Sequence, residues 1–155
     1  MSVVFQLSGS ELHLATMVGV QRALDAIRNG RKQRYGRDPG PAFDENIFAA
    51  AGEMALAKHF IMFWNGAFGN FEAADVGWQY QVRATEYLNG HLLLHPDDKD
   101  DQPFVLAIAQ LPVITLAGWV WGRDGKLDNY WAEPRPHRPC YCVPQSALTD
   151  VDQLQ

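Results

Sequence analysis

The sequence has few cysteines, no long hydrophobic run and no overall excess of basic charge, and each absence excludes a class of protein. Only Cys140 and Cys142 are cysteines, and a disulfide across one intervening residue would be strained. No apolar run reaches the length of about 18 residues that a membrane-spanning helix needs. We therefore expect a protein of a reducing compartment, with no membrane partner.

The N-terminal stretch from Met1 to Gln6 lacks the basic start and the long apolar region of a secretory signal peptide, which predicts a cytoplasmic protein. The chain has 155 residues, of which 47% are hydrophobic and 12% aromatic. This is enough for one domain with its own core and too little for two, so the predicted domain spans residues 1–155.

The net charge of -5 argues against broad, non-specific binding of nucleic acid. One segment departs from this acidic character. Between residues 22 and 37, Asp25 is the only acid, and the basic residues are Arg22, Arg28, Arg31, Lys32, Arg34 and Arg37. The helix end and loop at 22–41 could therefore contact DNA phosphates through Arg28, Arg31, Lys32, Arg34 and Arg37. The alternative is an ordinary solvated helix end and loop.

Two helices are predicted in the first half of the chain. Ser8 and Glu11 have the spacing of a reciprocal capping box, and apolar residues at helical spacing continue to Ile27, which predicts a helix over 9–29. Asp44 can cap a second helix with small residues around Gly52, which would let that helix approach a sheet closely. Glu53 borders the apolar stripe of this second helix, where a half-desolvated carboxylate needs a partner or a metal.

The second half of the chain is predicted to be mostly β-structure. Residues 79–88 and 91–95 flank Asn89-Gly90, the pattern of a hairpin with a type I' turn. The runs 104–110 and 113–121 are apolar enough to be strands buried on both faces, 132–139 reads as a proline-broken loop, and 141–143 as a last strand. This order predicts an α+β fold with a central mixed or antiparallel sheet flanked by helices.

Four polar residues could form a site for phosphodiester hydrolysis. Such chemistry needs oxygen ligands for Mg²⁺ or Mn²⁺ and a cation near the phosphate. Glu53, Asp75 and the amide oxygen of Gln81 could be the metal ligands, and Arg83 could be the cation. Gln81 and Arg83 are two residues apart on a predicted strand and therefore share a face.

The order of these residues resembles the PD-(D/E)XK nuclease superfamily, in which a helical Glu precedes an Asp and then (Glu or Gln)-x-Lys on a strand. Glu53, Asp75 and Gln81-Val82-Arg83 follow this order. The resemblance implies a restriction-endonuclease-like core and a divalent-metal-dependent nuclease with Mg²⁺ or Mn²⁺. Arg83 stands where the superfamily has lysine, and Gln81 stands where a carboxylate is commoner.

Several short blocks also resemble small proteins encoded by tailed phages, for which no activity is established. The blocks are 52–58, 74–77, 81–83, 104–106, 118–120 and 141–144. This likeness covers most of the chain between Val18 and Leu148, and it implies a viral origin and a place in the cytoplasm of the bacterial host. The partners it leaves open are DNA and a host or phage protein.

Three functions follow as alternatives. The first is a metal-dependent DNA nuclease, the second a catalytically inactive nuclease-like accessory protein that binds nucleic acid or a host or phage protein. The third is an oligomeric structural protein with the strand at 113–121 in its interface. The inactive reading predicts that Glu53 pairs with Arg83, or with Lys58 on its own helix, in place of a metal. Asp75 would then cap a turn, and Gln81 and Arg83 would be the polar face of a strand.

Overall fold

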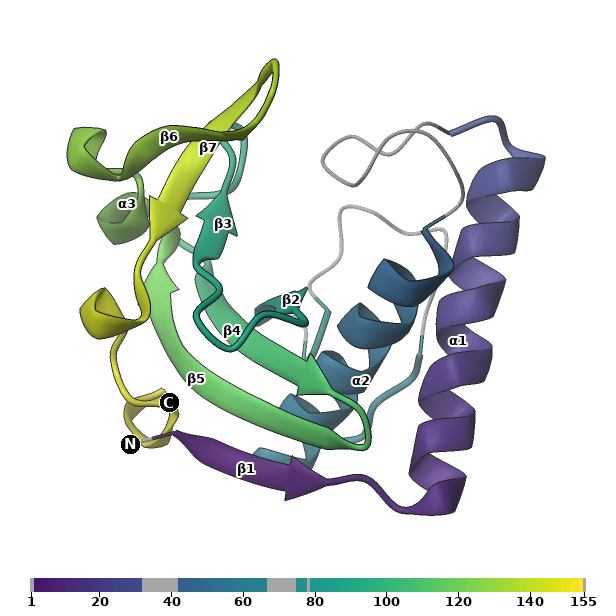
Figure 1. Cartoon of the computed structure of the whole chain (residues 1–155). Helices are drawn as coiled ribbons and strands as arrows, with labels where there is room; N and C mark the ends of the chain where they lie inside the picture. The colour runs from purple at the N-terminus through teal and green to yellow at the C-terminus, as the bar shows by residue number, and fades with distance from the viewer. Residues whose placement is uncertain (1, 32–41, 67–74, 78, 155) are drawn as a thin grey trace.

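The computed structural model of the chain describes residues 2–31, 42–66, 75–77 and 79–154. Helices and strands segregate into layers, with α1 and α2 side by side on one flank (Figure 1). The elements are β1 (Val3–Gln6), α1 (Gly9–Arg28), α2 (Phe43–His59), β2 (Gln81–Thr85), β3 (Leu92–Leu94), β4 (Pro103–Gln110), β5 (Val113–Trp121), α3 (Gly122–Gly125), β6 (Trp131–Arg135) and β7 (Arg138–Val143). Short 3-10 helices occupy Asp128–Tyr130, Gln145–Ala147 and Val151–Gln153.

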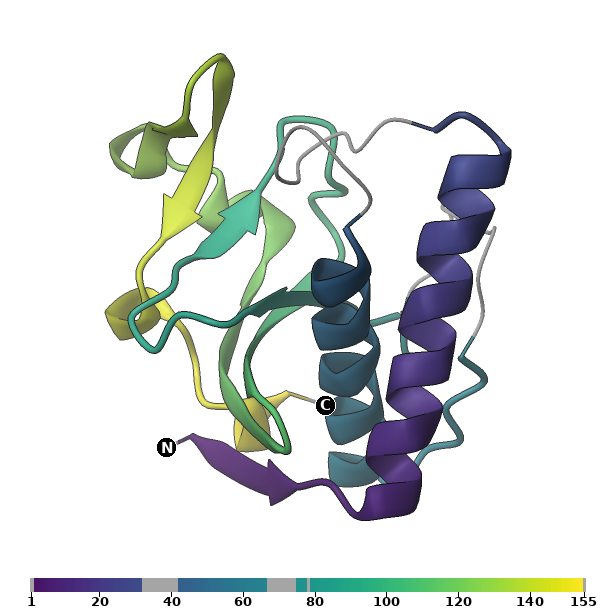
Figure 2. The ribbon, with the colours of Figure 1, turned by 45° about the vertical axis from the view of Figure 1, so that its right-hand side comes forward.

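The described strands form two sheets. The larger has the order β1-β5-β4-β2, in which β2 runs parallel to β4 and the other neighbours are antiparallel. The smaller, β3-β7-β6, is antiparallel. Helix α2 covers one face of the larger sheet, α1 packs on the outside of α2, and the smaller sheet lies on the other side of the larger one (Figures 1 and 2). The predicted α+β class with mixed and antiparallel sheets is confirmed, but the second sheet was not expected from the sequence.

The first helix begins where the sequence predicts it. The Ser8 hydroxyl accepts the Glu11 amide at 3.2 Å, and the Glu11 carboxylate accepts the Ser8 amide at 2.8 Å. This reciprocal cap satisfies two amides that the first turn leaves without helical partners. The face of α1 that packs on α2 carries small residues, and a Cβ on Gly19 would lie 2.5 Å from the Ile47 Cα. The two helices therefore approach closely.

The second helix lies directly on the larger sheet, as its small residues predict. A Cβ added to Gly52 would lie 2.8 Å from the Ala107 Cβ and 3.1 Å from a Val82 methyl group. A side chain here would push α2 away from β2 and β4. Ala50, Ala51 and Glu53 are also buried on this helix.

The central strand β4 is buried on both faces and contributes to two hydrophobic cores. Alternate residues point to opposite faces of a strand. One core lies under the helices and includes Val105, Ala107 and Ala109. The other lies under the small sheet and includes Phe104, Leu106, Leu92, Leu94 and Val143. The sequence-based prediction of a strand buried on both faces is confirmed for β4.

The predicted hairpin across Asn89-Gly90 is wrong, because the two strands join different sheets. Strand β2 pairs in parallel with β4, whereas β3 pairs with β7. Local turn chemistry is outweighed here by burial of Leu92 and Leu94 in the second core.

The predicted loop at 132–139 is also wrong, since β6 and β7 form a hairpin there with an irregular register between Ala132 and Arg135. Because β6 is an edge strand, it tolerates Pro134.

Strand β5 lies inside the larger sheet, between β1 and β4. Its Ile114 and Leu116 are fully buried in the core under the helices. The apolar residues of 113–121 therefore contribute to the core of the chain.

Among the described helices, none is long and apolar enough to cross a membrane.

Candidate functional site

Glu53 is a carboxylate buried between the helices, with an exposed fraction of 3%. Arg22 of α1 donates from its two terminal nitrogens to the two carboxylate oxygens, at 2.7 and 2.8 Å. The Trp64 indole N–H donates to the Glu53 Oε2 at 3.0 Å. This is the forked geometry in which an arginine binds a carboxylate most strongly. Glu53 is thus neutralised by a partner on the neighbouring helix.

The sequence places Arg22 opposite Glu53 through the small-residue face of α1. Arg22 follows Gly19 by three residues and precedes Ala23 by one, and both of those residues are buried. Burial alone would lower the pKa of the Arg22 guanidinium, but the hydrogen bond and charge of Glu53, with a smaller contribution from Asp75, raise it above its ordinary value. Arg22 therefore carries a permanent positive charge at this place.

Asp75 is brought to the same region by a tight turn. The Asp75 amide donates to the Tyr80 carbonyl at 2.9 Å, and Val76 and Tyr80 form an isolated antiparallel bridge. Gly77 has a φ of 60°, and a Cβ there would lie 2.3 Å from the Met62 terminal methyl group. The turn directs the Asp75 carboxylate back to the start of β2, where its Oδ2 accepts the Val82 amide at 2.7 Å. The turn at Gly77 and the Val82 amide together fix the position of the Asp75 carboxylate.

The protonation of Asp75 is shifted far from that of an ordinary aspartate. Burial raises its pKa to about 7, with the nearby charge of Glu53 adding to the rise. The Val82 amide, Arg83 and Arg22 act in the opposite direction but do not cancel it. Two carboxyl groups thus interact in a buried region, where Arg22 neutralises Glu53 and the charge of Arg83 also acts on Asp75. Near neutral pH, Asp75 can gain or lose a proton or respond to a cation.

Gln81 and Arg83 lie on the opposite face of β2 from Glu53. Val82 and Ala84 point toward Gly52 of α2, so the alternating residues on either side of Val82 point away from that helix. The Arg83 guanidinium lies 5.1 Å from the Phe104 ring centre, and Phe104 belongs to the second core. Glu53 and Asp75 are close enough for the charge of Glu53 to raise the pKa of Asp75, and Arg83, although it lies on the other face of β2, is close enough to lower that pKa.

Arg83 is paired with Asp98, at 2.8 Å from its terminal nitrogen to the Asp98 Oδ1. The other Asp98 oxygen accepts the His95 amide at 2.8 Å, which fixes the turn after β3. The predicted pairing of Glu53 with Arg83 is therefore wrong, because each has a different partner. The alternative with Lys58 is wrong too, since Lys58 reaches Glu11 at 2.6 Å. The reason is geometric: Lys58 extends along the outside of α2, whereas Glu53 points inward.

The predicted DNA-binding residues are only partly described by the structure. Arg28 is an exposed residue in the last turn of α1. Arg31 follows the helix and pairs with Asp25. Lys32, Arg34 and Arg37 lie outside the described residues. The basic segment therefore begins with Arg22, which faces inward, and continues with arginines at the end of the helix.

The described oxygen donors around Glu53 and Asp75 are fewer than Mg²⁺ or Mn²⁺ prefers. Among the described residues, no three His, Cys, Asp or Glu side chains gather as a metal-binding group. Both Glu53 oxygens accept N–H groups, and the Asp75 Oδ2 accepts another. Divalent ions of this kind prefer about six oxygen ligands, several of which can be water. A metal at Glu53 would therefore have to share the carboxylate with Arg22 and Trp64, or displace them.

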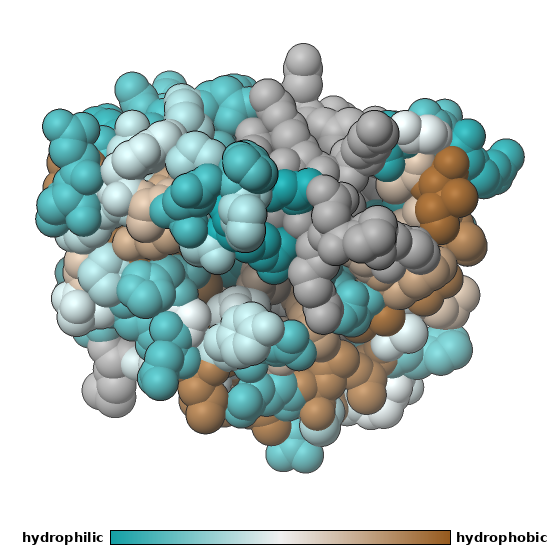
Figure 3. Space-filling model, turned by 45° about the horizontal axis from the view of Figure 1, so that its top comes forward, coloured by the Kyte–Doolittle hydropathy of each residue, from teal (hydrophilic) through white to brown (hydrophobic). Residues whose placement is uncertain are grey.

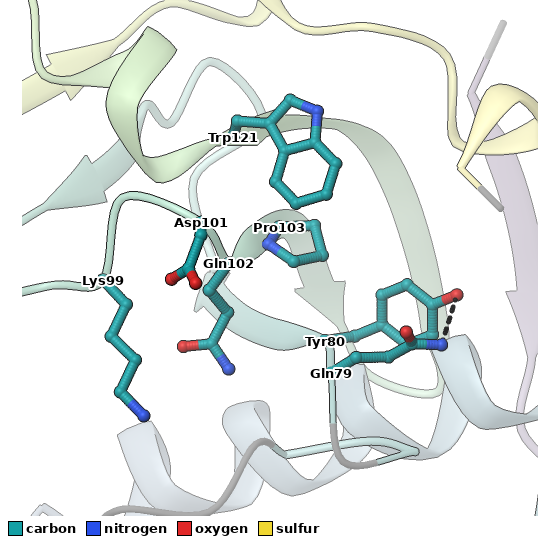
Figure 4. Close-up of a pocket in the computed structure, with 7 residues that line it drawn as sticks. All are labelled: Gln79, Tyr80, Lys99, Asp101, Gln102, Pro103 and Trp121. Carbon is teal, nitrogen blue, oxygen red and sulfur yellow. Dashed lines mark hydrogen bonds between the residues drawn. The ribbon is translucent and has the colours of Figure 1, made fainter.

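A pocket of about 260 Å³ opens beside the Asp75 turn (Figure 4). Its described lining consists of Gln79, Tyr80, Lys99, Asp101, Gln102, Pro103 and Trp121. The Gln79 amide donates to the Tyr80 hydroxyl at 3.1 Å. Lys99 is flanked in sequence by several aspartates, which makes the loop unfavourable for a phosphate group. None of the described candidate residues Glu53, Asp75, Gln81 and Arg83 lines this pocket.

Sequence reasoning missed Arg22 and Trp64 as the partners of Glu53. The usable signal was the stripe of small residues in α1, because such a stripe packs on another helix and carries Arg22 with it. Trp64 follows the end of α2, and no pattern in the sequence points its indole N–H back to Glu53.

No protein-family model matches the chain, and neither a curated protein nor a solved structure matches it.

Proposed function

We propose that the chain is a phage-encoded, nuclease-like domain with a restriction-endonuclease-like core, in which Arg22 takes the place of a divalent metal. It would then act as an accessory protein of the host cytoplasm that binds DNA without cutting it. The observation that carries this proposal is the fork of hydrogen bonds from Arg22 to both Glu53 oxygens.

The charge balance around Glu53 supports a site that functions without a metal. An arginine retains its proton at any physiological pH, so it neutralises Glu53 permanently. Trp64 adds a third hydrogen bond to the same carboxylate. Displacing Arg22 would bury a guanidinium without its partner, which costs several kcal/mol in typical proteins, about 3–5. A metal would have to supply that free energy in addition to its own dehydration.

DNA is the partner that the basic segment favours, with a host or phage protein as the alternative. Arg28 and Arg31 lie at one end of α1, followed in sequence by Lys32, Arg34 and Arg37. In an acidic chain this is the surface that phosphates would select. Binding through it should be weak, independent of sequence and steeply dependent on salt.

The raised pKa of Asp75 favours a second candidate, a metal-dependent DNA nuclease. A buried carboxyl group with a pKa of about 7 would lose its proton when a cation binds beside it. Glu53, Asp75 and Gln81 would then hold Mg²⁺ or Mn²⁺, with Arg83 near the phosphate. The bound ion would supply charge stabilisation and an activated water. This candidate requires Arg22 to share or release Glu53 and the side chains of Gln81 and Arg83 to reorient.

A cleavage assay separates the two candidates. Supercoiled, linear duplex and single-stranded DNA are incubated with the wild type and with Asp75→Asn in millimolar Mg²⁺ or Mn²⁺. We expect no cleavage by either protein. Cleavage by the wild type that is lost in a folded Asp75→Asn variant would overturn the first proposal and support the nuclease.

Binding is tested separately by the fluorescence anisotropy of a labelled duplex. We expect affinity to fall with salt and to fall further in the double variant Arg28→Glu/Arg31→Glu. The matched control is Arg123→Glu, which changes a basic residue with an exposed side-chain fraction of 57% on another surface. Equal loss of affinity in both variants would exclude the basic segment as the DNA-binding site.

A further inference from the structure

Two cysteine side chains lie next to each other on one face of the smaller sheet. Cys140 and Cys142 are alternate residues of β7, so they point to the same side of the strand. Their sulfur atoms are 3.8 Å apart, and both cysteines are reduced. Cys140 is buried and Cys142 is half-buried. The function proposed for Glu53 and Asp75 makes no use of this thiol pair.

The neighbouring strands hold the two thiols in place. Strand β7 is the central strand of the smaller sheet, between β3 and β6 (Figure 1). Cys142 lies opposite Leu93 of β3, and Cys140 lies opposite Ala132 of β6. The Cα atoms of alternate strand residues are about 6.6 Å apart, which is near the upper limit for a disulfide. A disulfide would require β7 to shorten and lose this pairing, so the fold favours two adjacent free thiols.

The surroundings of the thiol pair suit a small ion. Residues directly opposite each other in a sheet share a face, so Leu93 and Ala132 are the nearest cross-strand neighbours of the sulfur atoms. Neither side chain carries a polar atom that would compete for the thiols, and Ala132 is exposed. The surface over the smaller sheet, on the left of Figure 3, is largely hydrophilic. This polar surface is unsuited to an apolar partner.

We propose that Cys140 and Cys142 form a binding site for the soft monovalent ion Cu(I), held between their two thiolate sulfurs. Thiolate ligands select soft ions such as Cu(I). Within the described ranges, no group of three His, Cys, Asp or Glu side chains gathers as a metal site. The pair therefore lacks the four ligands of a structural zinc site. Cu(I) differs from zinc in forming stable complexes with only two sulfur ligands.

The separation of the two sulfur atoms is close to the one that such an ion needs. Zinc–thiolate bonds are about 2.3 Å long, and bonds of similar length on opposite sides of one ion would place the sulfurs about 4.6 Å apart. The sulfurs are 3.8 Å apart without the ion. Rotation about the two Cα–Cβ bonds can widen this separation, because the Cα atoms are further apart still. The backbone pairing of β7 would stay intact.

The charge near the pair also favours a bound cation. Binding of Cu(I) to two thiols releases two protons, and the resulting dithiolate complex carries one negative charge. Arg135 of β6 is close enough to Cys140 for its positive charge to lower the pKa of the thiol, although burial and Cys142 together raise that pKa to about 12. The same positive charge would stabilise the anionic complex. This inference does not depend on the function proposed for Glu53 and Asp75.

The test is an oxygen-free competition of the reduced protein with the coloured Cu(I) chelator bicinchoninate. The wild type should bind one Cu(I) per chain. Cys142→Ser should weaken binding by about 100-fold or more, because even partners outside the ligand shell contribute 10- to 100-fold. The matched control, Cys142→Ser/Glu86→Cys, keeps two cysteines but moves one to an exposed position in another loop. It should bind as weakly as Cys142→Ser, and circular dichroism checks that both variants fold.

X-ray absorption at the copper edge tests the same site without any substitution. The wild type loaded with one Cu(I) should show two sulfur neighbours and should remain a monomer by light scattering. Wild-type affinity no higher than that of Cys142→Ser/Glu86→Cys would overturn the proposal. Nitrogen or oxygen neighbours of the ion, or one ion shared by two chains, would overturn it as well.

Discussion

Two arginines meet carboxylates on the two faces of the larger sheet, and they are held in different ways. Arg22 and Glu53 join two packed helices, with exposed side-chain fractions of 17% and 4%. Arg83 and Asp98 join β2 to the turn after β3, with fractions of 29% and 15%. Both arginines lie close enough to Asp75 to lower its pKa, Arg83 more than Arg22.

The difference shows which arginine compensates the charge of the buried Glu53 carboxylate. Glu53 has its charge compensated in a forked geometry between helices that cannot separate without losing a core. Asp98 instead has a local structural role, because it also accepts the His95 amide in its own turn. The cation that neutralises Glu53 is thus Arg22, whereas sequence order alone directs attention to Arg83.

The largest effect is expected from removing Arg22. Arg22→Met retains most of the apolar stem but leaves Glu53 buried without its cation. We expect the free energy of unfolding to fall by about 3–5 kcal/mol, measured by urea denaturation at pH 7. The matched control is Arg28→Met on the same helix, which should change stability by less than about 0.5 kcal/mol.

A double variant then shows whether the lost stability comes from the unpaired charge of Glu53 or from packing of the Arg22 side chain. Arg22→Met/Glu53→Leu removes both charges and fills the space with apolar groups, so most of the lost stability should return. Equal losses from Arg22→Met and the control Arg28→Met would contradict the view that Arg22 has a special role. Failure of the double variant to recover stability would indicate that packing of the Arg22 stem, and not charge, dominates.

The next effect is a pH dependence that comes from Asp75. Its pKa is about 7 in the folded protein, against about 3.9 in an unfolded chain. Between these values the folded protein holds a proton that the unfolded chain has lost, so stability falls as pH rises from about 4 to 7 and levels off above that. The contribution is at most about 4 kcal/mol.

Asp75→Asn isolates this contribution, since its amide oxygen can still accept the Val82 amide while the carboxyl titration is removed. Urea denaturation of both proteins from pH 4 to 8 should show the wild type losing stability relative to Asp75→Asn as pH rises. Parallel curves for the two proteins would mean that Asp75 titrates as an ordinary aspartate.

The smallest effect is expected from Arg83. Arg83→Met breaks a partly exposed ion pair and should lower the free energy of unfolding by about 1 kcal/mol or less. A double-mutant cycle with Asp98→Asn measures the coupling between the two residues. A coupling as large as that of Arg22 with Glu53 would remove the distinction between the two faces.

The sequence predicts the helices better than the pairing of the strands. The capping box and the small residues around Gly52 act locally, so α1 and the contact of α2 with the sheet follow from them. Strand pairing depends on residues far apart in the chain. The Asn89-Gly90 turn signal is outweighed because β4 offers an edge to β2, and β7 offers one to β3.

In the candidate site, too, the features set by neighbouring residues are predicted and the contacts between distant residues are not. The sequence predicts that the buried Glu53 carboxylate needs a partner or a metal. It also predicts a shared face for Gln81 and Arg83, but not which face, since that is decided by Val82 and Ala84 packing on α2. The partner of Glu53 comes from another helix, 31 residues away in the chain, and no local pattern states that distance.

The most direct test of Arg22 in place of a metal is a calorimetric titration of the wild-type protein with Mn²⁺ at pH 7.5, repeated with Asp75→Asn. Because both Glu53 oxygens are held by Arg22, we expect no binding tighter than about 1 mM in either protein. Micromolar binding by the wild type that is lost in Asp75→Asn would contradict the account and show that the carboxylate pair is a metal site.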